Sequence, residues 1–102
     1  MNRDKKEIIT LGLIQSIQDE YGVDLIKGKT DRYLSDFRKM YCVYVYRNTR
    51  MTLGDISKAL QKSIGNISYY ISMHDKQMKG SVGYADNYEE FQDRMKNKSA
   101  TI

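Results

Sequence analysis

Two helix-start signals lie very close together between Met51 and Ser72. Thr52 can cap a helix that runs to about Leu60, and Asp55, three residues later, can act as its capping-box partner. Ser63 can cap a second helix that begins almost at once. Because only two or three residues join them, the chain must turn sharply between the two helices.

The rest of the chain also favours helices, since it contains no proline and its apolar residues recur at helical spacing. These repeats predict a first helix over about 4–20, which Gly22 ends, and a last helix over about 84–97, after Gly80 and Gly83 break the chain. The residues are Ile9, Leu13, Ile17 and Tyr21 in the first helix, and Tyr84, Tyr88, Phe91 and Met95 in the last.

The segment over about 33–48 fits two structures. Taken alone, YCVYVY is rich in strand formers. In the wider window DFRKMYCVYVYRN, one helical face collects the apolar residues Phe37, Met40, Tyr41, Tyr44 and Val45. The sequence offers no second strand as a pairing partner, so we predict a helix.

These elements predict an all-α fold, a small helical bundle of about five to six helices with a central helix-turn-helix. The length of 102 residues suits one domain, 1–102, with a core over about 8–96 and a tail at 97–102 that we expect to be flexible. The one cysteine, Cys42, excludes an intramolecular disulfide and fits a reducing cytoplasm. The N-terminal segment reads as neither a secretory signal nor a membrane span.

The second helix of the close pair has two different faces. With a helical rotation of 100° per residue, one side of this helix collects apolar residues and a histidine. This pattern predicts that the side packs against the core. The residues on this side are Ile64, Ile67, Ile71, His74 and Met78, and the opposite side carries Gly65, Asn66, Tyr69, Ser72, Met73 and Lys76. We interpret His74 as a core residue rather than a ligand or base, and Cys42 as a buried side chain rather than a nucleophile.

Positive charge gathers in the middle of the chain. Between Lys27 and Lys62 there are nine basic residues and three acidic ones, a net charge of +6 in a chain whose total is +4. A basic middle between mildly acidic ends favours one positive face, the electrostatic footprint of a nucleic-acid partner. The alternative is a solvated surface with chance clustering.

The spacing of the two capped helices is that of a helix-turn-helix, whose second helix enters the major groove. Near the start of that helix, Lys62, Ser63 and Asn66 are hydrogen-bonding groups suited to base edges. Gly65 removes bulk where a backbone can come close. The structural alternative is an ordinary αα-hairpin, in which Ser63 is only a cap.

The stretch from about Ile14 to Met95 resembles the C-terminal DNA-binding domain, domain IV, of the bacterial replication initiator DnaA, a Trp-repressor-like helix-turn-helix. IQSIQDEYGVDLIKGKTDR is similar to the opening helix, short turn and basic loop of that family. FRKMYCVYVYRNTRMTLGDISKAL is similar to its long helix and the start of its helix-turn-helix. KSIGNISYYI stands at the family signature, and YADNYEEFQDRM resembles the closing helix.

The resemblance implies a set of DNA contacts. The basic loop enters the minor groove in the family, and an arginine just before the long helix contacts DNA. The start of the first motif helix touches phosphate through backbone groups, and the signature residues read bases. The matching positions are Lys29 and Arg32 in the loop, Arg38 with Lys39, Thr52, Leu53 and Gly54, then Lys62, Ser63, Ile64, Gly65 and Asn66, with Tyr69 facing the backbone.

The chain departs from the family at two places. Ser-Ile-Gly-Asn at 63–66 replaces Asp-His-Thr-Thr of the signature, so the acidic acceptor for a cytosine amine is absent. Asp36 replaces a basic residue and repels phosphate. The departures motivate an alternative function, a protein-interaction module that keeps the fold and has lost DnaA-box binding.

We therefore expect a non-enzymatic protein that binds double-stranded DNA, either sequence-specifically or generally, to regulate replication or transcription, encoded by a phage or mobile element. We expect no cofactor, metal, nucleotide or membrane partner, and a cytoplasmic, nucleoid-associated location in a bacterial or phage-infected cell. A replication or transcription protein is the second expected partner. A third interpretation, binding of single strands or RNA through tyrosines such as Tyr33 and Tyr69, ranks below these two.

Overall fold

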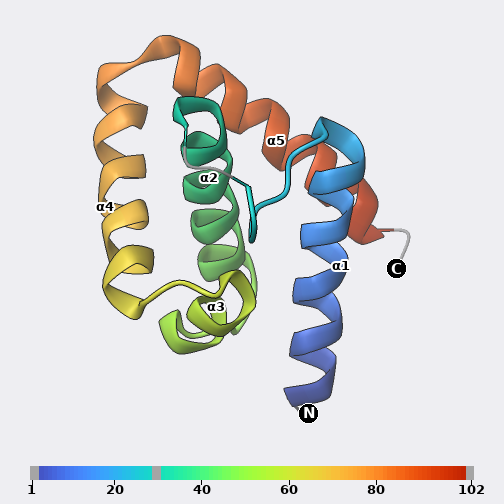
Figure 1. Ribbon diagram of the computed structural model, residues 1–102. Coiled ribbons are helices and arrows are strands. Elements are labelled where there is room, and N and C mark those ends of the chain that lie inside the picture. Colours follow the sequence, from blue (N-terminus) through green and yellow to red (C-terminus); the bar gives the residue numbers. More distant parts are fainter. Residues whose placement is uncertain (1–2, 29–30, 101–102) are drawn as a thin grey trace.

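The computed structural model describes residues 3–28 and 31–100, with side chains over 12–28, 31 and 33–96. This part of the chain forms five helices and no strand, which confirms the all-α prediction (Figure 1). The helices are α1 Arg3–Tyr21, α2 Arg32–Asn48, α3 Leu53–Leu60, α4 Ile64–Gly80 and α5 Val82–Ala100.

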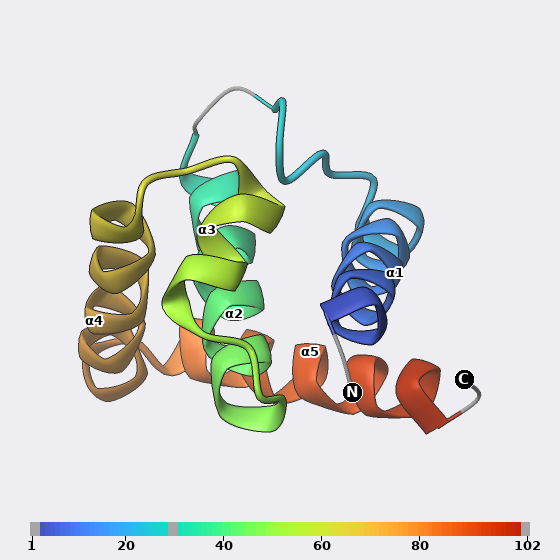
Figure 2. The ribbon, with the colours of Figure 1, turned by 90° about the horizontal axis from the view of Figure 1, so that it is seen from below.

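Helix α2 lies at the centre of the bundle. Figures 1 and 2 both place it between α1 and α4, with α5 crossing one side of the molecule. Every residue from Phe37 to Val45 is buried. A helix that is covered all round has no polar stripe, so its sequence resembles a buried strand. This burial explains why YCVYVY fits both structures.

The core is one cluster to which all five helices contribute. Aromatic rings form much of it, with ring centroids 4.5 Å apart for Tyr21 and Phe37 and 6.3 Å apart for Tyr88 and Phe91. The four predicted apolar residues of α5, from Tyr84 to Met95, are buried. The radius of gyration is 12.8 Å, close to the roughly 13 Å of a compact chain of this length.

Helix α5 differs from the prediction at both ends. It begins at Val82, so Gly83 lies inside the helix rather than in a break. The break is confined to Ser81, whose hydroxyl accepts a hydrogen bond of 3.2 Å from the Tyr84 amide. At the other end, the helix continues to Ala100, so most of the expected tail continues α5.

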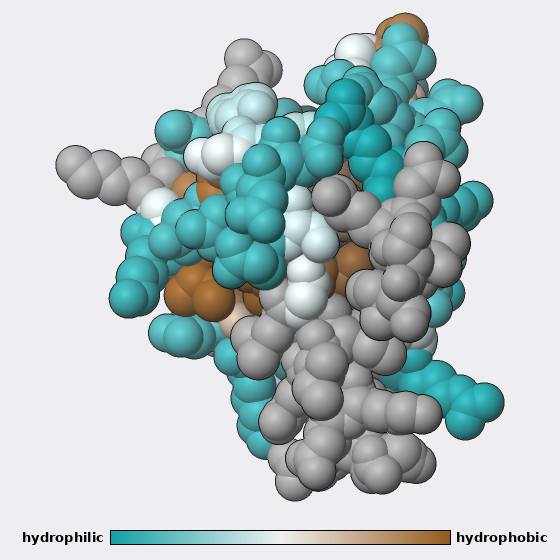
Figure 3. Space-filling model, turned by 90° about the vertical axis from the view of Figure 1, so that its right-hand side faces the viewer, coloured by the Kyte–Doolittle hydropathy of each residue, from teal (hydrophilic) through white to brown (hydrophobic). Residues whose placement is uncertain are grey.

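The surface seen in Figure 3 is mainly hydrophilic over its described residues, with apolar residues in small patches. No helix in the described part of the chain combines the length and the apolar character that a membrane span needs.

Candidate nucleic-acid interface

Helices α3 and α4 are joined by a tight, well-bonded turn. Gln61 adopts a left-handed conformation with φ 57°, and its amide donates to the Lys58 carbonyl at 3.3 Å. The Lys62 amide donates to the Ser57 carbonyl at 3.1 Å, and the Ser57 hydroxyl donates to the Lys62 carbonyl. These bonds fix the end of α3 relative to the start of α4.

Both predicted caps are present. The Thr52 hydroxyl accepts from the Asp55 amide at 3.1 Å, while the Asp55 carboxylate accepts from the Thr52 amide at 3.0 Å, which completes a capping box. The Ser63 hydroxyl accepts from the Asn66 amide at 3.1 Å. The amides of Leu53 and Gly54 precede any intrahelical carbonyl partner, so they remain first-turn donors.

One face of α4 is open to solvent. Ser63, Gly65 and Asn66 are exposed, and the Tyr69 side chain is 59% exposed. Ser72 and Lys76 continue this face along the helix, although the predicted site did not include them. The 100° spacing in the sequence already placed both residues on this side. We call Lys62, Ser63, Gly65, Asn66, Tyr69, Ser72 and Lys76 the α4 face.

The predicted packing stripe of α4 is shorter than expected. Ile67 and His74 are buried, whereas Ile64 is 53% exposed and Met78 is 37% exposed. The prediction that Ile64 packs is therefore wrong. A helical stripe predicts which side of a helix faces the core but not how far along the helix the core extends. Here the core does not cover Ile64, the first residue of α4.

Arg38 does not lie at the surface. The residue is fully buried, and its Nε donates to the Leu25 carbonyl at 2.7 Å while a terminal nitrogen donates to the Gly28 carbonyl at 3.0 Å. Buried carbonyls of a loop need donors, and the guanidinium supplies several in a fixed geometry. The expected contact of Arg38 with DNA is corrected on this ground: Arg38 supports the loop before α2.

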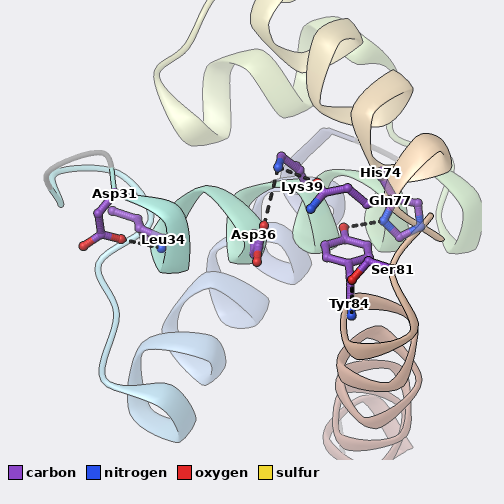
Figure 4. A network of polar contacts seen from close by, with 8 residues as sticks. All are labelled: Asp31, Leu34, Asp36, Lys39, His74, Gln77, Ser81 and Tyr84. Carbon is purple, nitrogen blue, oxygen red and sulfur yellow. Dashed lines mark hydrogen bonds and ion pairs between the residues drawn. The ribbon is translucent and has the colours of Figure 1, made fainter. Parts of the chain in front are cut away.

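Lys39 is also largely buried. Its Nζ donates to Gln77 Oε1 at 2.5 Å and lies 3.4 Å from Asp36 Oδ1. Figure 4 shows Lys39 between these two residues, so that it links α2 to α4. The expected contact of Lys39 with DNA is corrected in the same way, because its ammonium group is engaged inside the bundle.

For two other residues that were predicted to contact DNA, the structure does not describe the side chain. Lys29 lies outside the described residues, and the side chain of Arg32, the first residue of α2, lies outside them as well. Asp31 caps α2 by accepting from the Leu34 amide at 2.8 Å (Figure 4). This cap was not among the predicted ones, although an Asp before an apolar helical pattern is its usual signal.

His74 and Cys42 are buried core residues, as interpreted from the sequence. His74 Nδ1 lies 2.6 Å from the Tyr84 hydroxyl (Figure 4). Burial, helped by the positive charge of Arg47, lowers the pKa of His74 to about 4. Burial raises the pKa of the Cys42 thiol to about 12, which keeps it protonated and unreactive.

Exposed charges of both signs occur over the described part of the molecule, and the acidic ones are most numerous on α5. Lys27 and Lys58 are exposed, and Lys62 is half-buried. Figure 2 shows the segment 22–28 and α3 on one side and α5 on the opposite side. The exposed acidic residues of α5 are Asp86, Glu89, Glu90 and Asp93. No group of three His, Cys, Asp or Glu side chains among the described residues could hold a metal ion.

Comparisons with known proteins identify no relative of this chain. No protein-family model matches the chain, and no curated protein or solved structure matches it. The resemblance to DnaA domain IV therefore rests on the sequence pattern.

Proposed function

We propose that the chain binds double-stranded DNA by placing the α4 face in the major groove, as a regulator of replication or transcription related in design to DnaA domain IV. The observation that carries this proposal is the α4 face itself. It begins at a capped helix end directly after a tight turn, and α4 has no acidic residue before Asp75. An exposed helix of this kind meets the steric and electrostatic demands of the groove.

Gly65 supports the proposal. A Cβ at this position would meet only the Ser63 hydroxyl oxygen, at 3.8 Å, so internal packing does not require glycine. Gly65 therefore leaves room for an external surface to approach the backbone closely.

The proposed contacts divide into two groups. Asn66 and Lys62 contact base edges, since an asparagine amide pairs bidentately with adenine and a lysine reaches guanine. The amides of Leu53 and Gly54 at the start of α3, with Lys58 and Lys27, contact phosphates and orient the protein. The Ser63 hydroxyl still has a hydrogen to donate, because its cap bond uses it only as an acceptor.

Selection from a pool of random duplexes by the purified protein tests this function. We expect enrichment of a short motif, and we expect Asn66→Ala to relax the preference at one base pair by about 1–3 kcal/mol. Failure of the wild-type protein to retain any duplex would overturn the proposal.

A substitution at Gly65 separates groove binding from folding. Gly65→Leu should abolish duplex binding and leave the protein folded, because it adds bulk where the chain has open space. Gly83→Leu is the matched control, since a Cβ at Gly83 also meets nothing within 4 Å and α5 begins at the end of α4 that is far from Gly65 (Figure 1). Equal duplex affinity of the two variants would contradict groove insertion.

A protein partner is the second candidate function, and the exposure of Ile64 and Tyr69 favours it. Two apolar side chains on one helix end are typical of contact with another protein surface. A replication or transcription protein retained by the purified chain after nuclease treatment, with no duplex retained, would select this alternative. Loss of that partner on Ile64→Ser would assign the contact to α4.

A further inference from the structure

A small pocket lies between α1, α2 and α5, away from the α4 face. Its volume is about 170 Å³. In Figure 1 the C-terminal end of α1 and the N-terminal end of α2 lie at the top, whereas α4 begins at the bottom beside α3. The pocket is therefore apart from the start of α4, where the base-edge contacts are proposed.

Aromatic rings form the walls of the pocket. Tyr21, Tyr33 and Phe37 line it. The Tyr33 ring meets the Phe37 ring edge-on at a centroid distance of 4.9 Å, and the Tyr21 ring is tilted by 45° to the Phe37 ring at 4.5 Å. Rings set at angles enclose a space with electron-rich faces, the arrangement that holds cations in aromatic cages.

Carboxylates and an amide complete the lining, at Asp36, Glu90 and Asn87. Asp36 lies 3.4 Å from Lys39, whose shorter bond goes to Gln77, and Glu90 pairs with Arg94 at 2.7 Å. A carboxylate has about four acceptor positions, so each retains capacity for another cationic donor.

The chain itself already places a cation against this aromatic cluster. The guanidinium carbon of Arg94 lies 5.4 Å from the centre of the Tyr21 ring, within cation–π range. This contact shares Tyr21 and Glu90 with the pocket lining, and it indicates that the rings and carboxylates here suit a positive group.

The pocket is too small for a whole metabolite. Sites for drug-sized ligands have volumes of about 300–1,000 Å³, whereas one water takes about 30 Å³ in the liquid. The available space fits a single head group. Tyr33 is 58% exposed and Glu90 is exposed, so the remainder of the ligand must lie outside, on the protein surface. That arrangement suits a side chain projecting from a larger molecule.

We propose that this aromatic and acidic pocket binds the cationic end of a lysine or arginine side chain from a partner protein. The ammonium or guanidinium group lies against the exposed ring of Tyr33 and donates hydrogen bonds to Asp36 and Glu90. This site is a second interaction surface that works beside the proposed DNA-binding face and does not depend on it.

NMR titration of the isotopically labelled protein tests the proposal. The probes are the methyl esters of Nα-acetyl-lysine and Nα-acetyl-arginine, whose side chains stay charged. The methyl ester of Nα-acetyl-norleucine is the neutral control of similar length. We expect saturable shifts at the amides of Tyr33, Phe37 and Glu90 with the two cations only. Equal shifts with the norleucine ester, or no saturable shift with either cation, would overturn the proposal.

Variants of the pocket give the matched comparison. Tyr33→Ala should weaken cation binding about two- to fivefold, the size of an exposed cation–π contact. Tyr69→Ala, which removes an equally exposed tyrosine from α4, should leave binding unchanged. Asp36→Asn should also weaken binding, and it tests the carboxylate if the tyrosine variant is unstable. Unchanged affinity in both pocket variants would contradict the site.

Spermidine distinguishes a protein side chain from a free polyamine. We expect spermidine to bind no more tightly than the lysine ester, because only one of its ammonium groups fits the pocket. Saturation by spermidine at a much lower concentration would overturn the assignment to a protein partner.

Discussion

Two groups of basic residues in this molecule have opposite environments. Arg38 and Lys39 of α2 are buried and donate to groups of the protein itself. Lys58 of α3 is exposed, and Lys62 of the following turn is half-buried at the edge of the α4 face. In the sequence, both groups belong to the same basic middle third.

The difference shows that a basic segment mixes two kinds of charge. A buried cation stabilises the fold by satisfying carbonyl or amide oxygens, and it is not available to phosphate. An exposed cation costs the fold nothing and can release counterions when it binds DNA. The net charge of +6 therefore overstates the charge available to DNA.

The largest expected effect comes from Arg38. Arg38→Met should lower the free energy of unfolding by roughly 3 kcal/mol, because the carbonyls of Leu25 and Gly28 lose a charged donor. Urea denaturation measures this loss. Arg50→Met, at an exposed position, is the control and should change stability by no more than about 0.5 kcal/mol. Equal losses in the two variants would remove the distinction between buried and exposed cations.

The second effect concerns pH and His74. Its pKa is about 4 in the folded protein, below the ordinary value of 6.5, so the unfolded chain binds the proton first as the pH falls. Stability should therefore decline from about pH 6.5 towards pH 4, by about 2 kcal/mol between pH 7 and pH 5. The comparison is unfolding of wild type and His74→Gln at both values, and an identical decline in both would refute the assignment.

The third effect concerns the cap that starts α3. Thr52→Ala should cost about 1 kcal/mol, since it leaves the Asp55 amide without its side-chain acceptor. Thermal unfolding measures the change. Ser72→Ala, in the exposed middle of α4, is the control and should be neutral. A neutral Thr52 variant would mean that the capping box does not define the helix start.

The smallest effect is on the salt dependence of duplex binding. Lys62→Gln should weaken duplex binding severalfold and reduce the slope of log affinity against log salt by about one unit. Lys39→Gln should leave the slope of the folded protein unchanged, because its Nζ lies inside the bundle. A reduced slope in the Lys39 variant would show that this lysine reaches DNA after all.

Local signals predicted the fold well, and long-range burial limited the prediction of the site. Thr52, Ser63 and the aromatic steps of α5 act within one or two helical turns, so their roles follow from spacing. The roles of Arg38 and Ile64 depend on where distant parts of the chain lie. The burial of Arg38 by the loop at Leu25 has no local signal, and neither has the point where the core ends along α4.

The salt dependence of duplex binding is the decisive measurement for the proposed DNA interface. Three lysines on the proposed interface, Lys27, Lys58 and Lys62, should each release about 0.9 counterion, which gives a log–log slope of about −3. Fluorescence anisotropy with a labelled duplex should then show affinity falling roughly 40-fold between 50 and 200 mM salt. A slope near zero, or no binding at 50 mM salt, would contradict the account.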